Sequence, residues 1–168
     1  MKNKEIERKW ILKELPDVHG GDDYFLYDSS RIEAIYLSTN PYVRIAIRTG
    51  ADGTMTAKQT IKFGSGLVRD EFEVYMDPIM CMDIIERFGA RPIIKHSWIY
   101  ATDDGQTILT SVVDSDTDTE FYYAEVEFNS IEEANAYKLP SFMAGCDPVE
   151  VTGNSNWSMN MYWKRTRG

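Results

Sequence analysis

The sequence has little of several features that would assign it to a class at once. Only two cysteines, Cys81 and Cys146, occur in 168 residues, and neither has a partner at metal-ligand spacing, so neither a disulfide framework nor a zinc cluster is indicated. No stretch approaches eighteen consecutive apolar residues, so no membrane-spanning helix is expected. The first residues, MKNKEIERKW, are charged where a signal peptide needs an apolar segment. These absences predict a soluble, cytoplasmic protein without a membrane partner.

Positive charge is also scarce. The chain has 18 Lys and Arg against 27 Asp and Glu, a formal net charge of −9. Because proteins that hold nucleic acid in general do so by meeting phosphates with Lys and Arg, general nucleic-acid binding is not expected. Apolar residues make up 43% and aromatic residues 12%, which is enough material for a buried core. The length predicts a single domain over residues 1–168.

The positions of turn-forming residues along the chain predict many strands and few helices. Turn residues separate eight predicted strands: 4–12, 31–38, 41–49, 54–63, 67–76, 93–101, 106–113 and 120–129. Helices are predicted over 78–88, over 131–137 with a capping box at Ser130 and Glu133, and over 155–163. The acidic run at Asp114, Asp116 and Asp118 is interpreted as a solvated turn. The predicted fold class is mainly β (α+β), an antiparallel sheet or barrel with flanking helices.

Charged side chains alternate along five of the predicted strands. Since successive side chains of a strand point to opposite faces, the charges of each strand share one face. These charges are Glu5, Glu7 and Lys9; Arg44 and Arg48; Lys58 and Lys62; Arg69, Glu71 and Glu73; and Glu125 and Glu127. A sheet with one solvated face is one interpretation. In a closed barrel, the same pattern would line a lumen with both signs of charge.

Such a lumen has a definite chemistry. Carboxylates that face each other repel by about 4 kcal/mol per close pair at an effective dielectric constant of about 20. A hard divalent cation such as Mg²⁺ or Mn²⁺ compensates them locally and keeps positions open for phosphate oxygens. The remaining Lys and Arg side chains then need an anion, which Arg grips through two hydrogen bonds. The pattern therefore suggests a site for a metal and a polyphosphate.

The order of motifs along the chain resembles one family. Glu5-Ile6-Glu7-Arg8-Lys9 matches the ExExK signature of the CYTH domain, or triphosphate tunnel metalloenzymes. Further matches follow in the family's order over nearly the whole chain: Val43–Arg48, Thr60-Ile61-Lys62, Gly66–Glu73, Lys95, Ala124–Phe128 and the closing segment from Leu139 to Asn160. The family includes inorganic triphosphatases, thiamine triphosphatases and class IV adenylate cyclases.

This resemblance implies an eight-stranded antiparallel tunnel that binds a small-molecule triphosphate with Mg²⁺ or Mn²⁺. It implies metal binding by Glu5, Glu7, Glu125 and Glu127. It implies triphosphate binding by Lys9, Arg44, Arg48, Lys62, Arg69 and Lys95. Catalytic roles are implied for Lys9, Arg69, Glu71 and Glu73.

Four positions depart from the family's pattern. Ala46 and Ser97 stand where the family usually has Arg, and Leu109 and Ser111 stand where it usually has an acidic pair. Metal-dependent hydrolysis of inorganic triphosphate or of a nucleoside or organic triphosphate is the leading hypothesis. Two alternatives stay open: a class IV adenylate cyclase that makes cyclic AMP and pyrophosphate, and a non-catalytic binder of phosphorylated ligands. The sequence leaves open whether the chain forms a homodimer.

Overall fold

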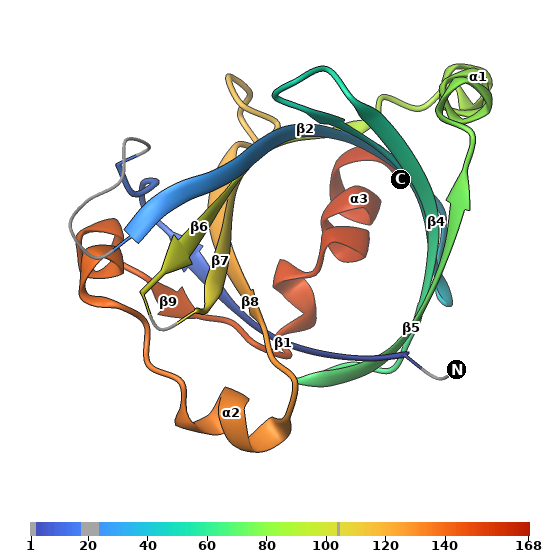
Figure 1. The fold of residues 1–168 in the computed structure, drawn as a ribbon. Coiled ribbons are helices and arrows are strands. Elements are labelled where there is room, and N and C mark those ends of the chain that lie inside the picture. The colour runs from blue at the N-terminus through green and yellow to red at the C-terminus, as the bar shows by residue number, and fades with distance from the viewer. Residues whose placement is uncertain (1–2, 18–23, 104) are drawn as a thin grey trace.

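Eight strands form a closed antiparallel barrel in the computed structural model, which describes residues 3–17, 24–103 and 105–168 (Figure 1). The strands follow the order β5-β4-β3-β2-β6-β7-β8-β1, and pairing of β5 with β1 closes the barrel. A two-residue strand, β9, pairs antiparallel with Trp10 and Ile11 of β1. The strand bounds are β1 Asn3–Leu12, β2 Tyr24–Thr39, β3 Tyr42–Gly50, β4 Met55–Phe63, β5 Val68–Met76, β6 Ile93–Thr102, β7 Thr107–Val113, β8 Phe121–Glu127 and β9 Val149–Glu150.

The outer face of the barrel is covered on two sides. Helix α1 (Pro78–Phe88) begins at Asp77, whose side chain accepts hydrogen bonds from the backbone N–H groups of Ile79 and Met80. Its buried residues Cys81 and Ile85 pack with the outward side chains of β2, β3 and β4. On the other side, β1, β7 and β8 pack against the segment that contains η1 (Ser141–Cys146) and the residues that follow α2 (Ile131–Ala136). Because apolar contacts cover the outward side chains on both sides of the barrel, the charged side chains of these strands point into the lumen.

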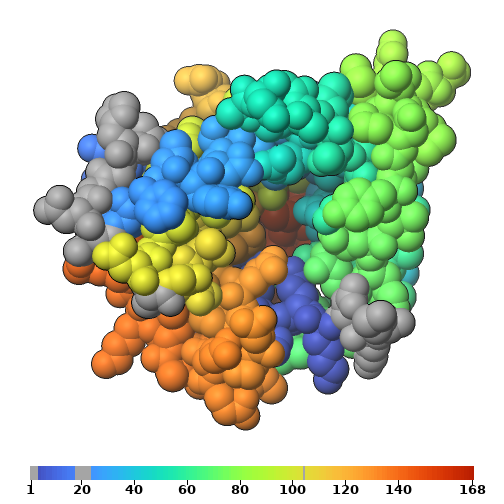
Figure 2. Space-filling model, viewed as in Figure 1, coloured from blue at the N-terminus to red at the C-terminus, as the bar shows by residue number. Residues whose placement is uncertain are grey.

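The C-terminal helix α3 (Met159–Arg167) lies inside the ring of strands rather than on its surface (Figure 1). Its buried residues Tyr162 and Trp163 pack with Tyr36 and Phe121. Figure 2 shows the hollow of the barrel from one end, with α3 at its bottom. The helix therefore fills one end of the lumen and leaves room at the other.

A buried ion pair holds α3 in this position. Arg167 Nη2 lies 2.6 Å from Asp114 Oδ2, and both side chains are 3% exposed. The Tyr162 hydroxyl donates a hydrogen bond of 2.5 Å to the same carboxylate oxygen, and the Ile94 backbone N–H donates to the other oxygen. The prediction of a solvated acidic turn is thus wrong for Asp114. Its carboxylate is buried because Arg167, 53 residues later in the sequence, lies on the C-terminal helix and pairs with it. Asp116 and Asp118 are exposed, as expected.

Several predicted elements differ from the observed ones. Strand β2 begins at Tyr24, well before the predicted 31–38, because the polar run Asp28-Ser29-Ser30 continues the pairing with β6 past an irregularity in register. The predicted helix 155–163 is two elements, a 3₁₀ turn η2 (Ser155–Trp157) and α3. The short elements η1 and β9 were not predicted. The other strands, α1 and α2 match the prediction to within two residues at each end. Of the helices in the described ranges, none has the length and apolar character needed to cross a membrane.

Candidate functional site in the barrel lumen

The register of the strands turns the alternating charges toward one lumen. Glu5 pairs with Arg69, Glu7 with Glu127 and Lys9 with Glu125 across the two sides of β1. Lys62 pairs with Glu71, and Lys95 lies on the inward face of β6. Glu5 and Lys9 are each 8% exposed and Lys95 is 6% exposed. Exposures this low contradict the alternative of a solvated sheet face and confirm the lumen.

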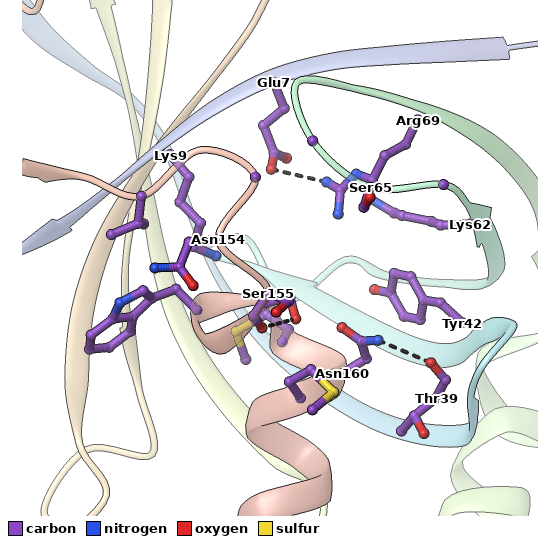
Figure 3. A pocket seen from close by; sticks show the side chains of 18 of the residues that line it. Glu7, Lys9, Thr39, Tyr42, Lys62, Ser65, Arg69, Asn154, Ser155 and Asn160 are labelled. Carbon is purple, nitrogen blue, oxygen red and sulfur yellow. Dashed lines mark hydrogen bonds and ion pairs between the residues drawn. The ribbon is translucent and has the colours of Figure 1, made fainter.

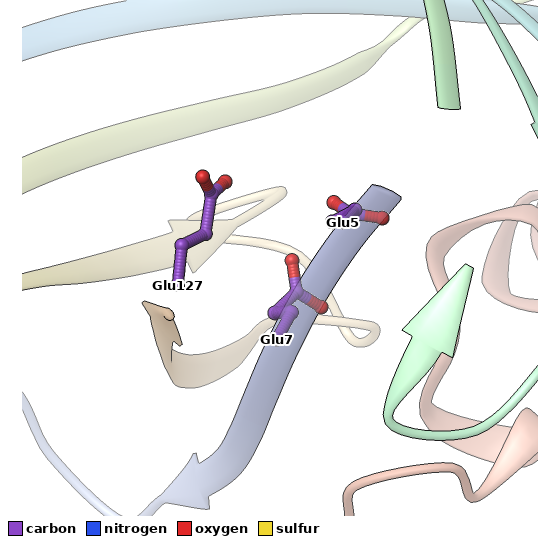
Figure 4. Close-up of side chains that lie close together, drawn as sticks. All are labelled: Glu5, Glu7 and Glu127. Atoms are coloured by element: carbon purple, nitrogen blue, oxygen red, sulfur yellow. The ribbon is translucent and has the colours of Figure 1, made fainter. Parts of the chain in front are cut away.

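Three of the four carboxylates predicted to bind metal come together. Glu5, Glu7 and Glu127 each place an oxygen within 4.8 Å of the others (Figure 4). Burial, followed by the nearby charge of Glu125, raises the pKa of Glu7 to about 8. Burial and the charges of Glu5 and Glu71 also raise the pKa of Glu127. A cluster of hard oxygen ligands with excess negative charge fits a divalent cation such as Mg²⁺ or Mn²⁺.

The fourth predicted metal ligand, Glu125, lies outside this cluster. Its Oε1 accepts a hydrogen bond of 2.8 Å from Lys9 Nζ. Burial acts to raise the pKa of Glu125, but Lys9 and Lys95 outweigh burial and lower the pKa to about 2. Glu125 is therefore an ionised partner of the cations in the lumen.

Two of the predicted phosphate-binding cations are tied to the carboxylate cluster. Lys62 Nζ lies 2.6 Å from Glu5 and 3.2 Å from Glu71. Arg69 Nη2 lies 3.0 Å from Glu5 and 3.1 Å from Glu7. These contacts balance part of the negative charge and orient the carboxylates.

Two other cations form no ion pair with a carboxylate among the described residues. Arg44 donates from Nη2 to Thr60 Oγ1 at 3.3 Å, while its Nε is buried without a hydrogen-bond partner. Lys95 Nζ donates to the Tyr123 hydroxyl at 2.8 Å, and burial lowers its pKa to about 7 although the charge of Glu125 acts in the opposite direction. Because a buried charge outside any ion pair is costly, both side chains are suited to bind an anion that enters the lumen.

A cavity of about 470 Å³ joins these groups (Figure 3). Its strand-borne wall carries the charged side chains Glu7, Lys9, Arg44, Lys62, Arg69, Lys95 and Glu125. The facing wall comes from the turns at 39–40 and 64–66 and from residues 151–161. The turn at 64–66 and the C-terminal segment are in close contact at Gly153, whose φ is +74°. A Cβ at this position would lie only 3.1 Å from the Cα of Gly66, so the contact favours glycine. The sequence did not predict the facing wall as part of the site, because the predicted site residues were all charged and this wall has almost no charge.

Five of the predicted site residues do not line this cavity. Two of them, Glu5 and Glu127, belong to the carboxylate cluster. Of the other three, Arg48 pairs with Asp28, Glu73 accepts a hydrogen bond of 2.6 Å from Lys58, and Glu71 lies 3.2 Å from Lys62. These residues share the inward face, as predicted, but lie in a layer of ion pairs beside the cavity.

The four unusual residues also face inward. Ser97 pairs with Ser111 and Leu109 with Glu125, so these side chains share the face of Lys95 and Glu125. Ser97 Oγ and Ser111 Oγ are hydrogen-bonded at 2.8 Å and are 2% and 0% exposed as residues. Ala46 lies between Arg44 and Arg48 on the inward face of β3. The lumen wall is therefore uncharged and buried at Ser97 and Ser111.

Comparison with solved structures identifies the fold. The inorganic triphosphatase NE1496 is similar with a TM-score of 0.61 and 22% identity, over 98% of this chain and 97% of that one. The putative adenylyl cyclase HpAC1 from Hippeastrum, described as having a dominant triphosphatase activity, has a TM-score of 0.60 and 12% identity, over 98% of this chain and 97% of that one. The protein PH1819 from Pyrococcus horikoshii OT3 has a TM-score of 0.59 and 18% identity, over 96% and 98%. Neither a family model nor a curated protein matches the chain.

A closed antiparallel barrel with a charged lumen and an internal C-terminal helix defines the class of protein. The chain has the triphosphate tunnel fold of CYTH-type proteins, and the resemblance inferred from the sequence is confirmed at the level of the fold.

Proposed function

We propose that this chain is a metal-dependent triphosphatase, which hydrolyses a phosphoanhydride bond of a triphosphate held in the tunnel. The observation that carries the proposal is that Arg44 and Lys95 form no ion pair in the described part of the chain, yet share a cavity with Glu7. Cations that need an anion thus lie beside carboxylates that need a cation. The similarity in fold to two proteins described as having triphosphatase activity supports the same function.

Each group has a role in this proposal. Glu5, Glu7 and Glu127 would hold Mg²⁺ or Mn²⁺, which when bound neutralises phosphate charge and polarises the phosphoryl group. Arg44 and Lys95 bind the phosphate chain, and Lys9 and Arg69 stabilise the negative charge that develops on its oxygens. A bound polyanion also favours the protonated form of Lys95, whose pKa lies at about 7 without it. Glu125 keeps Lys9 oriented toward the cavity.

Two other functions have specific support. HpAC1, which has a similar fold, is described as a putative adenylyl cyclase, and in a cyclase reaction the ribose hydroxyl would replace water as the nucleophile. The uncharged positions Ala46, Ser97, Leu109 and Ser111 favour a non-catalytic binder. Analysis of the products separates these functions.

We expect the purified chain, incubated with ATP or inorganic triphosphate and Mg²⁺ or Mn²⁺, to release orthophosphate. Colorimetric phosphate detection measures hydrolysis, and chromatography of the ATP reaction detects cyclic AMP. Cyclic AMP with pyrophosphate would indicate the cyclase. Binding by calorimetry without any product would indicate the binder.

Replacing Arg44 should weaken triphosphate binding more than replacing Arg48. A hydrogen bond between charged groups contributes about 1.5–3 kcal/mol, so Arg44→Met should lower affinity for inorganic triphosphate roughly ten- to a hundredfold. Arg48→Met should cost less, because Arg48 is engaged with Asp28 away from the cavity. Isothermal titration calorimetry measures both affinities. An equal loss in both variants would place the anion outside the cavity described here.

A further inference from the structure

Tyr123 is a buried aromatic side chain that stands behind two lysines of the cavity wall. It lies on β8 two positions before Glu125, so both side chains face the lumen. Tyr123 is 0% exposed and does not itself line the cavity. Because a buried phenol needs a partner for its hydroxyl, the contacts of Tyr123 indicate what the side chain does.

Tyr123 contacts the two lysines through different parts of its side chain. Lys95 Nζ donates a hydrogen bond of 2.8 Å to the hydroxyl. Lys9 Nζ lies 3.8 Å from the centroid of the ring, where the negative face of an aromatic ring attracts a cation. Lys95 Nζ lies 5.6 Å from the same centroid, so the hydroxyl is its nearer contact. One rigid side chain thus fixes the positions of two ammonium groups.

Lysine needs such support more than arginine does, because its ammonium is a single charged point at the end of a flexible stem. A side chain that is held before the ligand arrives loses less conformational freedom on binding, which raises the affinity. Lys9 has a second support in Glu125, at 2.8 Å, whereas Lys95 has no ion pair among the residues that the structure describes. The position of Lys95 therefore depends on the hydroxyl of Tyr123.

The hydroxyl of Tyr123 is itself held from β7, where Ser111 is its partner in the register of the sheet. Burial, followed by the charge of Glu125, raises the pKa of Tyr123 well above its usual value, while a hydrogen bond with Ser111 acts against this shift. Ser111 Oγ is in turn hydrogen-bonded to Ser97 Oγ at 2.8 Å. Both serines depart from the pattern of the family, so a series of neutral hydroxyls leads to Lys95 where that pattern has charged groups.

We propose that Tyr123 is a positioning residue of the triphosphate site, which holds Lys95 Nζ by its hydroxyl and Lys9 Nζ by the face of its ring. The inference rests on the proposed triphosphatase function and adds a residue that acts on the ligand through the two lysines. It predicts that the two parts of the side chain can be separated, because Tyr123→Phe releases Lys95 and keeps the ring beside Lys9.

Binding measurements on the full chain test the inference with the metal present and without turnover. Calorimetry in excess Mg²⁺ uses a triphosphate whose bridging oxygens are replaced by NH, which resists hydrolysis. Tyr123→Phe should weaken binding of this analogue about three- to tenfold. Tyr123→Leu also removes the ring and should weaken binding about threefold or more beyond that. Tyr100→Phe is the matched control, because Tyr100 is also 0% exposed but packs against Phe142 outside the cavity, and it should leave the affinity unchanged.

A double-mutant cycle separates positioning from a general structural role. In the background of Lys95→Met, Tyr123→Phe should change the affinity by less than about twofold, since the lysine on which the hydroxyl acts is gone. In the background of Lys9→Met, the same substitution should keep its full effect. A full effect of Tyr123→Phe in the Lys95→Met background would overturn the inference, because the hydroxyl would then act by another route.

Urea denaturation repeats the cycle without a ligand, so the contact is tested even where a variant binds too weakly to measure. Tyr123→Phe should lower the equilibrium constant for folding about five- to tenfold, and clearly less once Lys95→Met is present. Additive effects in this cycle would overturn the inference alone. A wild-type chain that binds neither the analogue nor inorganic triphosphate in Mg²⁺ would instead overturn the triphosphatase proposal on which the inference rests.

Discussion

Glu7→Gln is expected to reduce triphosphate hydrolysis at least about a hundredfold, because Glu7 belongs both to the carboxylate cluster and to the cavity wall. The amide keeps the shape of the side chain but removes one negative charge from a proposed cation site. A bound metal ion contributes several kcal/mol to stabilising the transition state, and each 1.36 kcal/mol is about tenfold in rate. Phosphate release under saturating Mg²⁺ or Mn²⁺ measures the loss.

The matched control is Glu33→Gln, which makes the same chemical change on the outer face of β2, where Glu33 pairs with Arg31. It should retain wild-type activity. Exhaustive chelation of cations from the wild type should reproduce the loss seen in Glu7→Gln. Activity that survives both chelation and Glu7→Gln would show that the cluster holds no catalytic cation.

Asp114→Asn should lower the free energy of unfolding by about 3–5 kcal/mol. The substitution leaves the guanidinium of Arg167 buried beside a neutral amide, and removing one partner of a buried ion pair typically costs this much. The hydrogen bonds from Tyr162 and Ile94 would also lose their charged acceptor. Urea denaturation followed by circular dichroism measures the change through the midpoint and slope.

A double variant tests the cause. Asp114→Asn combined with Arg167→Met removes both charges, so it should recover part of the stability lost in the single variant. Arg87→Met is the surface control, because Arg87 pairs with Asp83 in an exposed pair on α1 and should cost less than about 1 kcal/mol. A stability loss in Asp114→Asn no larger than in Arg87→Met would mean that α3 is held by its apolar contacts alone.

The lumen could be predicted from the sequence because its signal is local. In parts of β1, β5 and β8 charged residues stand at alternate positions, and a period of two converts directly into one face of a strand. The resemblance placed Lys95, Ser97 and Ser111 at family positions, but the pairing of Ser97 with Ser111 became visible only in the structure. What the sequence could not decide is which charges neutralise one another, as with Glu125 and Lys9, because that depends on side-chain direction across the barrel.

The second wall of the cavity was not predictable in the same way. Residues 151–161 contain no periodic pattern, and they reach the lumen only because α3 turns inward. That turn depends on a pair between Asp114 and Arg167, and neither residue carries a local sign of it. Asp114 looked like part of an exposed acidic run because its two acidic neighbours are indeed exposed. Long-range partners of this kind follow from the packing and not from spacing.

The closure of the barrel also bears on how the chain folds. β1 has no pairing partner near it in the sequence: it pairs with β5, β8 and β9, and Glu7 pairs with Glu127. During synthesis β1 can pair with β5 once residue 76 has been made, but the barrel cannot close until β8 (Phe121–Glu127) follows. Topologies dominated by such distant pairings fold slowly, on the scale of milliseconds to seconds. Since Glu5, Glu7 and Lys9 all lie on that strand, the binding site is completed only when the barrel closes, and gain of triphosphate binding would report the last step of folding.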